Sequence, residues 1–244
     1  MIAVDSFTKL YGDLVAVENL SFAVGAGEVL GLVGPNGAGK TTTLRALAGI
    51  IAPTRGSIAI AGFPLSTQPV QAKQRLAFIP DEPQLFEYLT VEEHLRFVGR
   101  MYGVRDAPQR IPALLAELEL SEKQRALPTE LSRGMRQKLA IACGLLHEPA
   151  ALILDEPLTG LDPAGMRRMR ATVTQRAAQG TSVILSSHLL NLVEELCTKL
   201  LVLRQGQAVA YGTIGEIIEA HPTLMSKSLE EVFLSLTATD LTAG

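Results

Sequence analysis

The sequence predicts an α/β fold with a core sheet of buried strands, an N-terminal antiparallel β-subdomain and an inserted helical subdomain. Short, continuously apolar runs at 29–33 and 151–154 are typical of strands that are buried on both faces, and 181–185 is expected to be another buried strand. Between the first and second of these runs, residues 84–148 show helical patterns and no convincing strand. This order predicts that the helical stretch is inserted between strands of one sheet.

The segments before the helical stretch have the pattern of strands and turns. Glycine-containing clusters mark turns at 11–13 and 25–27. The additional strands expected here are 2–4, 16–24, 57–63 and 76–79, the last of which ends at a proline. Together these strands predict the β-subdomain and one further strand of the core.

Helices are expected where apolar residues recur at helical spacing. Thr90 and Glu93 form a capping box that opens one helix, and Ser132 is a good N-cap for another. Further helices are expected at 41–50, around 108–118, from 163 to about 180, at 215–220 and at 229–234. Two strands, at 199–204 and 207–211, precede the last two of these helices.

The predicted elements divide the chain of 244 residues into three parts. Residues 1–83 and 149–214 are expected to form the core together with the β-subdomain. Residues 84–148 are expected to form the helical subdomain, and 215–244 a C-terminal helical tail.

Composition limits the classes of function. Hydrophobic residues make up 47% of the chain and charged residues 19%, as in an ordinary folded protein. The formal net charge of −3 gives no overall basic field, which argues against nucleic acid as a partner. Cys143 and Cys197 lack metal-type spacing, and no apolar run approaches 18 residues. We therefore expect a reduced, cytoplasmic chain that does not cross a membrane itself.

The segment from Gly34 to Thr41 fits the phosphate-loop pattern, in which two glycines flank four residues and Lys and a hydroxyl residue follow. Glycines allow successive N–H groups to converge on a polyphosphate, and the next helix adds its positive dipole end. Lys40 would place a charge near the β- and γ-phosphates, and the Thr41 hydroxyl can ligate Mg²⁺. The residues expected to bind the nucleotide are Gly34, Pro35, Asn36, Gly37, Ala38, Gly39, Lys40, Thr41 and Thr42.

Two carboxylates, Asp155 and Glu156, follow the apolar strand at 151–154. Ligands gather at the carboxyl ends of parallel strands, so Asp155 is expected beside the phosphate loop, oriented toward a metal. Glu156 is a candidate to orient or deprotonate the water that attacks the γ-phosphate. The same Asp-Glu-Pro tripeptide at 81–83 follows a proline and is interpreted as a loop.

The residue pattern alone does not decide the roles of three residues. His188 stands at the carboxyl end of the strand at 181–185, where a structural and a catalytic role are equally open. Ser132 either caps a helix and no more, or opens a helix whose N-terminus receives a phosphate. From spacing alone, Tyr11 is favoured as an ordinary half-buried aromatic in a turn.

In sequence order, the phosphate loop, the Leu-Ser-x-Gly segment at 131–134, Leu-Asp-Glu-Pro at 154–157, Leu161-Asp162 and His188 resemble an ATP-binding-cassette (ABC) ATPase. The likeness extends from Tyr11 to Tyr211, and the ordered set is far more specific than any one motif. It implies a P-loop NTPase (RecA-like) core that binds ATP and Mg²⁺ and hydrolyses ATP to ADP and phosphate.

The resemblance also implies roles that spacing left open. Tyr11 matches the aromatic residue on which the family stacks adenine. Asp155 matches the Mg²⁺-associated aspartate, and Glu156 matches the catalytic base. His188 matches the switch histidine that contacts the γ-phosphate.

Other matching residues imply a second subunit. In the family, residues matching Ser132 and Gly134 hold the ATP of the opposite protomer, and Asp162 matches the loop that joins the protomers. The expected assembly is a homodimer or a pair with a similar chain. The Ser-x-Gly-Met signature and the tail at 229–233 look like the bacterial exporter branch, which pairs with separate membrane permease subunits. The resemblance thus implies a cytoplasmic protein held peripherally on the inner face of the membrane.

The chain departs from the family pattern at two places. The family signature is Leu-Ser-Gly-Gly-Gln, whereas Arg133 and Met135 replace its third and fifth residues. In the family, a Gln in the loop leading to the helical subdomain touches Mg²⁺, and Asp81 stands at that point here. Asp81 is therefore a candidate for the metal site beside Thr41 and Asp155.

Three other functions share part of this pattern. A soluble ABC-type ATPase acting on nucleic acid, the ribosome or cofactor assembly has the same cassette. Members that join two cassettes in one chain need twice this length, and members with long coiled-coil insertions need heptad repeats. This sequence has neither feature. A kinase or GTPase would not explain the signature helix, and no Asn-Lys-x-Asp segment for guanine occurs. A non-hydrolysing binding subunit is disfavoured by Glu156. We therefore predict an ATP-hydrolysing transporter subunit, in which ATP-driven dimer closure powers a separate permease, with export as the expected direction.

Overall fold

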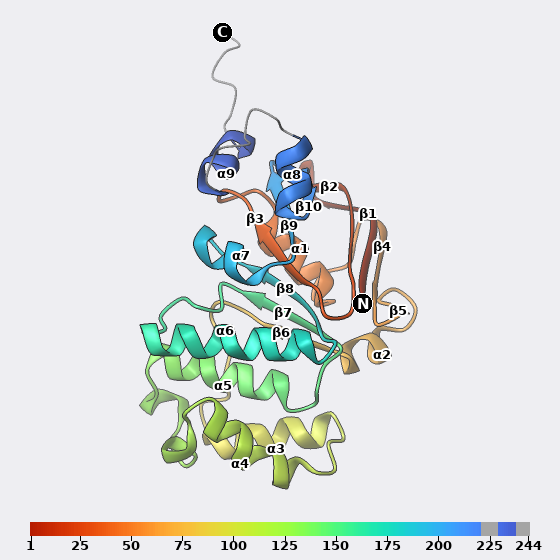
Figure 1. Cartoon of the computed structure of the whole chain (residues 1–244). Coiled ribbons are helices and arrows are strands. Elements are labelled where there is room, and N and C mark those ends of the chain that lie inside the picture. Colours follow the sequence, from red (N-terminus) through yellow and green to blue (C-terminus); the bar gives the residue numbers. More distant parts are fainter. Residues whose placement is uncertain (221–228, 238–244) are drawn as a thin grey trace.

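The computed structural model describes residues 1–220 and 229–237, and its core sheet has the strand order β10-β9-β3-β8-β7-β6 (Figure 1). All neighbours in this sheet pair in parallel except β9 and β10, which are antiparallel. The strands are β3 (Val29–Val33), β6 (Leu76–Ile79), β7 (Ala151–Asp155), β8 (Ser182–Ser186), β9 (Lys199–Arg204) and β10 (Gln207–Gly212). The predicted α/β fold is confirmed.

A second, antiparallel sheet has the order β2-β1-β4-β5 and is formed by β1 (Ile2–Tyr11), β2 (Leu14–Val24), β4 (Arg55–Ile60) and β5 (Phe63–Pro64). Two predictions are corrected here. Tyr11 ends a long strand instead of lying in the turn, and the single strand predicted at 57–63 is a hairpin. Its turn residues, Ala61 and Gly62, have φ angles of 51° and 85°. Alanine rarely adopts a positive φ, so the sequence carried no signal for this turn.

The helices of the described residues surround the core sheet. They are α1 (Lys40–Leu47), α2 (Pro69–Gln74), α3 (Val91–Met101), α4 (Ala107–Glu117), α5 (Arg133–Leu145), α6 (Pro163–Ala178), α7 (Leu190–Leu196), α8 (Ile214–Ala220) and α9 (Leu229–Thr237). The sequence did not predict α2 and α7, which span only six and seven residues. Between β6 and β7 the elements are helical, as expected, whereas the exact boundaries at 84 and 149 stay predictions.

Capping hydrogen bonds fix where the helices around the site begin. Thr90 and Glu93 exchange side-chain-to-backbone bonds of 3.3 and 2.8 Å, which confirms the capping box of α3. The Ser132 hydroxyl accepts from the N–H three residues later at 3.2 Å, as predicted for the N-cap of α5. The carboxylate of Asp162 caps α6 in the same way at 2.7 Å. Each cap satisfies an N–H group that the helix itself leaves unpaired.

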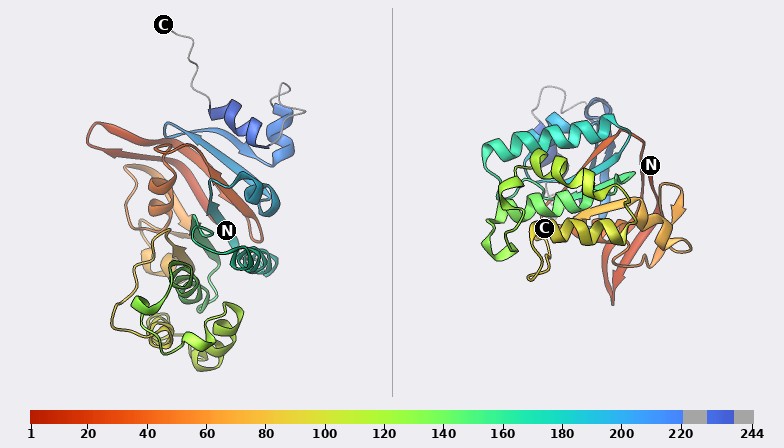
Figure 2. Two further views of the ribbon diagram at one scale, coloured as in Figure 1. Left: turned by 90° about the vertical axis from the view of Figure 1, so that its left-hand side faces the viewer. Right: turned by 90° about the horizontal axis from the view of Figure 1, so that it is seen from below.

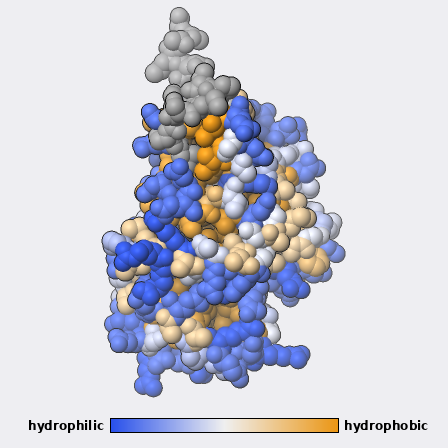
Figure 3. Space-filling view, in the orientation of Figure 1, coloured by the Kyte–Doolittle hydropathy of each residue, from blue (hydrophilic) through white to orange (hydrophobic). Residues whose placement is uncertain are grey.

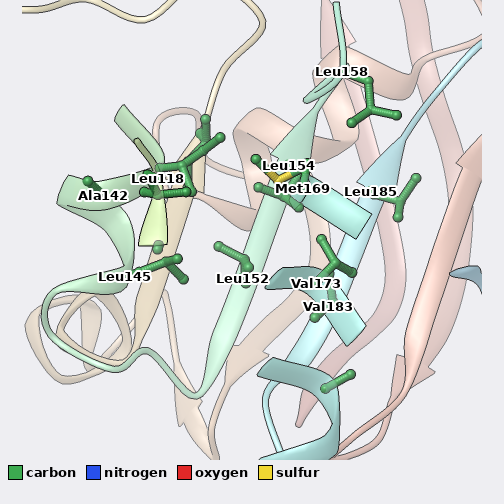
Figure 4. Packing of buried hydrophobic residues seen from close by; sticks show 14 of the residues in the cluster. Leu118, Ala142, Leu145, Leu152, Leu154, Leu158, Met169, Val173, Val183 and Leu185 are labelled. Atoms are coloured by element: carbon green, nitrogen blue, oxygen red, sulfur yellow. The ribbon is translucent and has the colours of Figure 1, made fainter. Parts of the chain in front are cut away.

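Successive residues of the core strands alternate between two buried faces of the sheet. Leu152 and Leu154 of β7 pack with residues of α5 and α6 on one face (Figure 4). Ile153, between them, packs on the opposite face with residues of α1 and of the antiparallel sheet. Burial on both faces explains why the sequence shows continuous apolar runs instead of alternation.

The added elements lie at different ends of the core sheet. Figures 1 and 2 show α3 and α4 at one end, α8 and α9 at the opposite end, and the antiparallel sheet along one side. Of the predicted tail at 215–244, α8 and α9 are described, and 221–228 and 238–244 lie outside the described residues. Hydrophilic residues dominate the face drawn in Figure 3. Within residues 1–220 and 229–237, none of the helices has the length and apolar composition that crossing a bilayer requires.

The two-sided burial of β7 generates a stability prediction. Leu152 is 1% exposed, so Leu152→Ala removes buried methyl groups and leaves a cavity. We expect the free energy of unfolding to fall by about 2–5 kcal/mol, measured by denaturant titration. The control Val70→Ala, at a residue that is 64% exposed, should change it by less than about 0.5 kcal/mol. Equal stabilities for the two variants would contradict this packing.

Candidate functional site

A cavity of about 470 Å³ lies where the phosphate loop meets the carboxyl ends of β6 and β7. Its wall has three sources: the hairpin between β1 and β2, the loop with the first turn of α1, and the residues that end or follow β6 and β7. The lining residues are Tyr11, Leu14, Val15, Ala16, Asn36, Gly37, Ala38, Gly39, Lys40, Thr41, Thr42, Asp81, Asp155 and Glu156. The structure thus brings together residues that the sequence predicted for the nucleotide, the metal and the base.

Two glycines allow the loop to fit between other backbone segments. A Cβ on Gly34 would lie 2.5 Å from the carbonyl oxygen of Leu203 at β9. Gly39 has a φ of 101°, and a Cβ there would lie 2.8 Å from the carbonyl oxygen of Ala16. Any side chain at either position would force backbone apart, so the loop shape depends on glycine at both.

Lys40 lies at the start of α1, and its ammonium group is part of the cavity wall. Its Nζ donates to the carbonyl oxygens of Gly34 at 2.6 Å and Pro35 at 3.1 Å. Burial lowers the pKa of the Lys40 ammonium, and the carboxylates of Glu156 and Asp155 oppose that shift. The ammonium is thus held over the loop by oxygen acceptors, which is also the chemistry that a phosphate offers.

Ser186 links the two carboxylates at the end of β7. Its hydroxyl donates to Oδ1 of Asp155 at 2.6 Å and accepts from the N–H of Glu156 at 3.0 Å. Glu156 has a φ of 47°, which is uncommon for a residue with a side chain and is held in place by this bond. No sequence pattern indicates a role for Ser186, because its position opposite Asp155 follows only from the order of the strands.

His188 and Glu156 are in contact beyond the ends of β8 and β7. Nδ1 of His188 lies 2.8 Å from Oε2 of Glu156, within hydrogen-bond distance. The His188 side chain is 68% exposed, whereas that of Glu156 is 21% exposed. The two predicted catalytic residues are therefore brought together, although the contact of His188 with a phosphate stays a prediction.

Ser132, Gly134 and Asp162 are absent from the cavity lining that the described residues provide. Ser132 and Asp162 cap α5 and α6. Gly134 packs closely on the segment before α6, since a Cβ there would lie 2.9 Å from the carbonyl oxygen of Gly160. The roles predicted for these three residues between subunits stay predictions.

Oxygen donors at the cavity fit a magnesium ion. Thr41, Asp155 and Asp81 all line the cavity, and hydroxyl and carboxylate oxygens are the ligands that Mg²⁺ prefers. Among the described residues there is no group of three or more His, Cys, Asp or Glu side chains placed to hold a metal by themselves. Mg²⁺ commonly uses one or two protein ligands and completes its shell with water and substrate phosphates, so the donor set is suitable.

The comparison with protein families decides the identity of this arrangement. The family profile described as "ABC transporter" matches residues 17–159, more than half of the chain. The chain belongs to the ABC transporter family. It is an ATP-binding subunit and an ATPase, as the order of its motifs implied, and it is exporter-like, as its signature and tail implied.

Relatives in the ABC transporter family match along most of the chain. The ABC-type transporter ATP-binding protein EcsA of Bacillus subtilis is 34% identical over 98% of this chain and 98% of its own length. The Nod factor export ATP-binding protein I of Cupriavidus metallidurans is 38% identical over 87% of this chain and 71% of its own. A solved structure of an ATP-binding subunit of an ABC transporter matches with a TM-score of 0.93 and 36% identity, covering 98% of this chain and 100% of that one.

The position of Ser186 generates the second prediction. Ser186→Ala removes a buried hydroxyl that two groups use, so the free energy of unfolding should fall by about 1–3 kcal/mol. The ATPase kcat should fall as well, because Asp155 and Glu156 lose their shared anchor. Denaturant titration and steady-state kinetics measure the two effects.

The neighbouring variant Ser187→Ala is the control. The Ser187 hydroxyl accepts from the N–H of Leu189 and makes neither of the bonds to the carboxylate strand. A kcat for Ser186→Ala that equals the kcat for Ser187→Ala would show that Ser186 does not position the site.

Proposed function

We propose that this chain hydrolyses ATP in the 470 Å³ cavity as one of two subunits that close around two nucleotides and drive a separate membrane permease. One observation carries the proposal. The phosphate loop, Asp155 and Glu156 line one cavity, whereas Ser132 and Gly134 of the signature segment lie outside it in the same chain. Residues that the family places on one nucleotide are thus divided between the cavity and a separate surface, which is the division that a two-subunit site requires.

Within one subunit, each wall of the cavity has a distinct task. Tyr11 stacks on the adenine, and its ring is supported by the Lys9 ammonium 5.1 Å from the ring centroid. The loop N–H groups and Lys40 bind the phosphates. Thr41 and Asp155 would hold Mg²⁺, which when bound neutralises charge on the phosphate oxygens.

Glu156 is the proposed general base. Its backbone is fixed by Ser186 and its carboxylate is within hydrogen-bond distance of His188. A carboxylate held at one position can orient a water and accept its proton as the bond to the γ-phosphate forms. His188 is the group through which this base and the γ-phosphate would be connected.

The second subunit would complete the site from the start of α5. Ser132 is exposed, and α5 presents there the positive end of a 13-residue helix. A nucleotide bound to the opposite subunit has the negative charge that this helix end attracts. Asp162, at the start of α6, would lie in the seam between the subunits.

The permease would dock on an apolar groove of about 290 Å³ beside the loop that follows β6. Its lining includes Leu85, Phe86 and Val98, and the next aromatic residue, Tyr88, is 90% exposed. Exposed aromatic residues around an apolar groove are typical of a protein interface. An apolar segment of a membrane subunit fits this surface, and the relatives named for Nod factor export support export as the direction.

The role of Tyr11 is tested with two substitutions. Tyr11→Ala should weaken Mg-ATP binding by about 1–3 kcal/mol, because base stacking on an aromatic ring has this magnitude elsewhere. Tyr11→Phe keeps the ring and should bind ATP with nearly unchanged affinity. Equilibrium binding of ATP to both variants gives the comparison, and equal losses would assign the effect to the hydroxyl instead of the ring.

The role of Glu156 is tested with Glu156→Gln, which keeps the size and a hydrogen-bonding carbonyl but cannot accept a proton. Hydrolysis should slow by about 10²–10⁴-fold while ATP binding is retained. ATP then stays in the closed pair, so the variant should accumulate as a dimer. Gel filtration with light scattering, with and without Mg-ATP, measures this directly.

Two controls complete the Glu156 experiment. ADP in place of ATP should leave Glu156→Gln monomeric, because ADP lacks the γ-phosphate. A variant that stays monomeric with saturating ATP is measured again with the permease present. Absence of ATP-dependent closure in that complex would refute the two-subunit site.

A further inference from the structure

We propose that Arg133 is a positioning residue: its ion pair with Asp81 ties the surface offered to the partner's nucleotide to the wall of the chain's own cavity. Asp81 lines that cavity, and Arg133 lies between Ser132 and Gly134 in the signature segment. The inference rests on the two-subunit function proposed above, and it adds a path by which one nucleotide site influences the other.

The two side chains meet across a long stretch of sequence. Nη2 of Arg133 lies 3.1 Å from Oδ1 of Asp81, and 52 residues separate them. The Arg133 side chain runs over Gly160, where a Cβ would lie 3.1 Å from Cδ of Arg133. Arg133 and Asp81 are two positions at which the chain departs from the family pattern, and each residue provides the charge that the other needs.

A second contact attaches the same helix turn to the same loop. Gln137, one turn after Arg133 in α5, is 2% exposed, and its Nε2 donates to the carbonyl oxygen of Pro80 at 3.4 Å. The start of α5 is therefore connected to the loop after β6 at two adjacent points. Because Ser132 and Gly134 are on this turn, a change in the position of Asp81 changes the position of both.

The exposure of the ion pair sets the size of the effect. The Arg133 and Asp81 side chains are 50% and 41% exposed, so solvent screens their attraction. Such a pair shifts an equilibrium by about two- to fivefold. Holding Ser132 and Gly134 in place before the partner arrives reduces the ordering that binding requires, so the pair favours closure. The coupling is reciprocal: closure on the partner's nucleotide also favours the position of Asp81 at the chain's own cavity.

Arg133 has one competing role, which is direct attraction of the partner's phosphates by its charge. In that case Asp81 would have no effect on closure of the dimer, or its negative charge would weaken the attraction. The two roles predict different results when both residues are changed, because a positioning role acts through the pair and a direct role does not.

The test is a double-mutant cycle in the Glu156→Gln background, with Asp81→Asn, Arg133→Gln and both together. Light scattering against Mg-ATP concentration gives the concentration at half-maximal dimerisation. We expect each single variant to raise this Mg-ATP concentration about two- to fivefold. The double variant should raise it by no more than a single variant does. ATP affinity of the monomer, measured at a protein concentration too low for dimerisation, should be unchanged by Arg133→Gln, because Arg133 does not line the cavity. Asp81 does line it, so the variants that change Asp81 are compared at equal occupancy of the monomer by Mg-ATP.

Matched variants separate positioning from general damage. Arg133→Lys keeps the charge and should restore most of the parental dimerisation, which a loss of packing alone would not explain. Arg136→Gln removes the same charge from the same helix, but Arg136 neither lines the cavity nor pairs with Asp81. This variant should therefore dimerise at the same Mg-ATP concentration as the Glu156→Gln protein.

The outcomes that overturn the inference are distinct. Additive losses in the cycle, or a silent Asp81→Asn, would show that Arg133 acts without Asp81. Unchanged dimerisation by Asp81→Asn at equal nucleotide occupancy would show that Asp81 acts on its own nucleotide alone and not through Arg133. If the Glu156→Gln protein itself dimerises with Mg-ATP, any of these results refutes this inference alone. If that protein never dimerises, even with the permease present, the proposed function is refuted as well.

Discussion

The parallel pairing of β7 with β8 is the constraint on which the candidate site depends, because it places Asp155 directly opposite Ser186. Both strands are buried on both faces, so a one-residue shift of register would move every apolar side chain to the opposite face, where the packing partners differ. Hydrophobic burial thus fixes the position of two polar groups at the sheet edge. Asp155 and the backbone of Glu156 are then held by one short hydrogen-bond chain through Ser186.

The same sheet edge receives opposite charges from separate parts of the chain. Lys40 reaches it from the phosphate loop after β3, and the two carboxylates reach it from β7. Burial disfavours the ammonium of Lys40, whereas the carboxylates favour it, so the cavity can hold a cation at the position where a polyphosphate needs one. The loop carbonyls of Gly34 and Pro35 provide hydrogen bonds that reduce the cost of this burial.

Local patterns account for the parts of the fold and site that the sequence predicted. The capping box of α3 and the N-cap Ser132 need only neighbouring residues, and the structure has both. Glycine spacing in the phosphate loop and apolar runs in the strands are local signals of the same kind. They were sufficient for the α/β fold and for residues that line the cavity.

Features that depend on distant residues or on unusual backbone could not be predicted. The hairpin at Ala61 requires a positive φ that alanine rarely adopts, and Ser186 gains its role only once the strand order is known. The contact of Arg133 with Asp81 joins residues 52 positions apart. At the sequence level each of these two residues was a separate departure from the family pattern, and only the folded chain relates them.

The strengths of the contacts around α5 differ in a way that suits a joint between subdomains. Leu139 and Ile141 of α5 are 0% and 1% exposed within the main core, so removing the helix from the sheet would expose a large apolar surface. The contact at the start of the same helix is an exposed ion pair, which is worth at most about 1 kcal/mol. Small movements of the turn that contains Ser132 and Gly134 therefore require little free energy, while the body of the helix stays packed. A joint of this kind can respond to a bound nucleotide without local unfolding. The free energy of ligand contacts exceeds that of the exposed ion pair, so a ligand can move this turn. It remains well below the free energy of core packing, so the body of the helix stays in place.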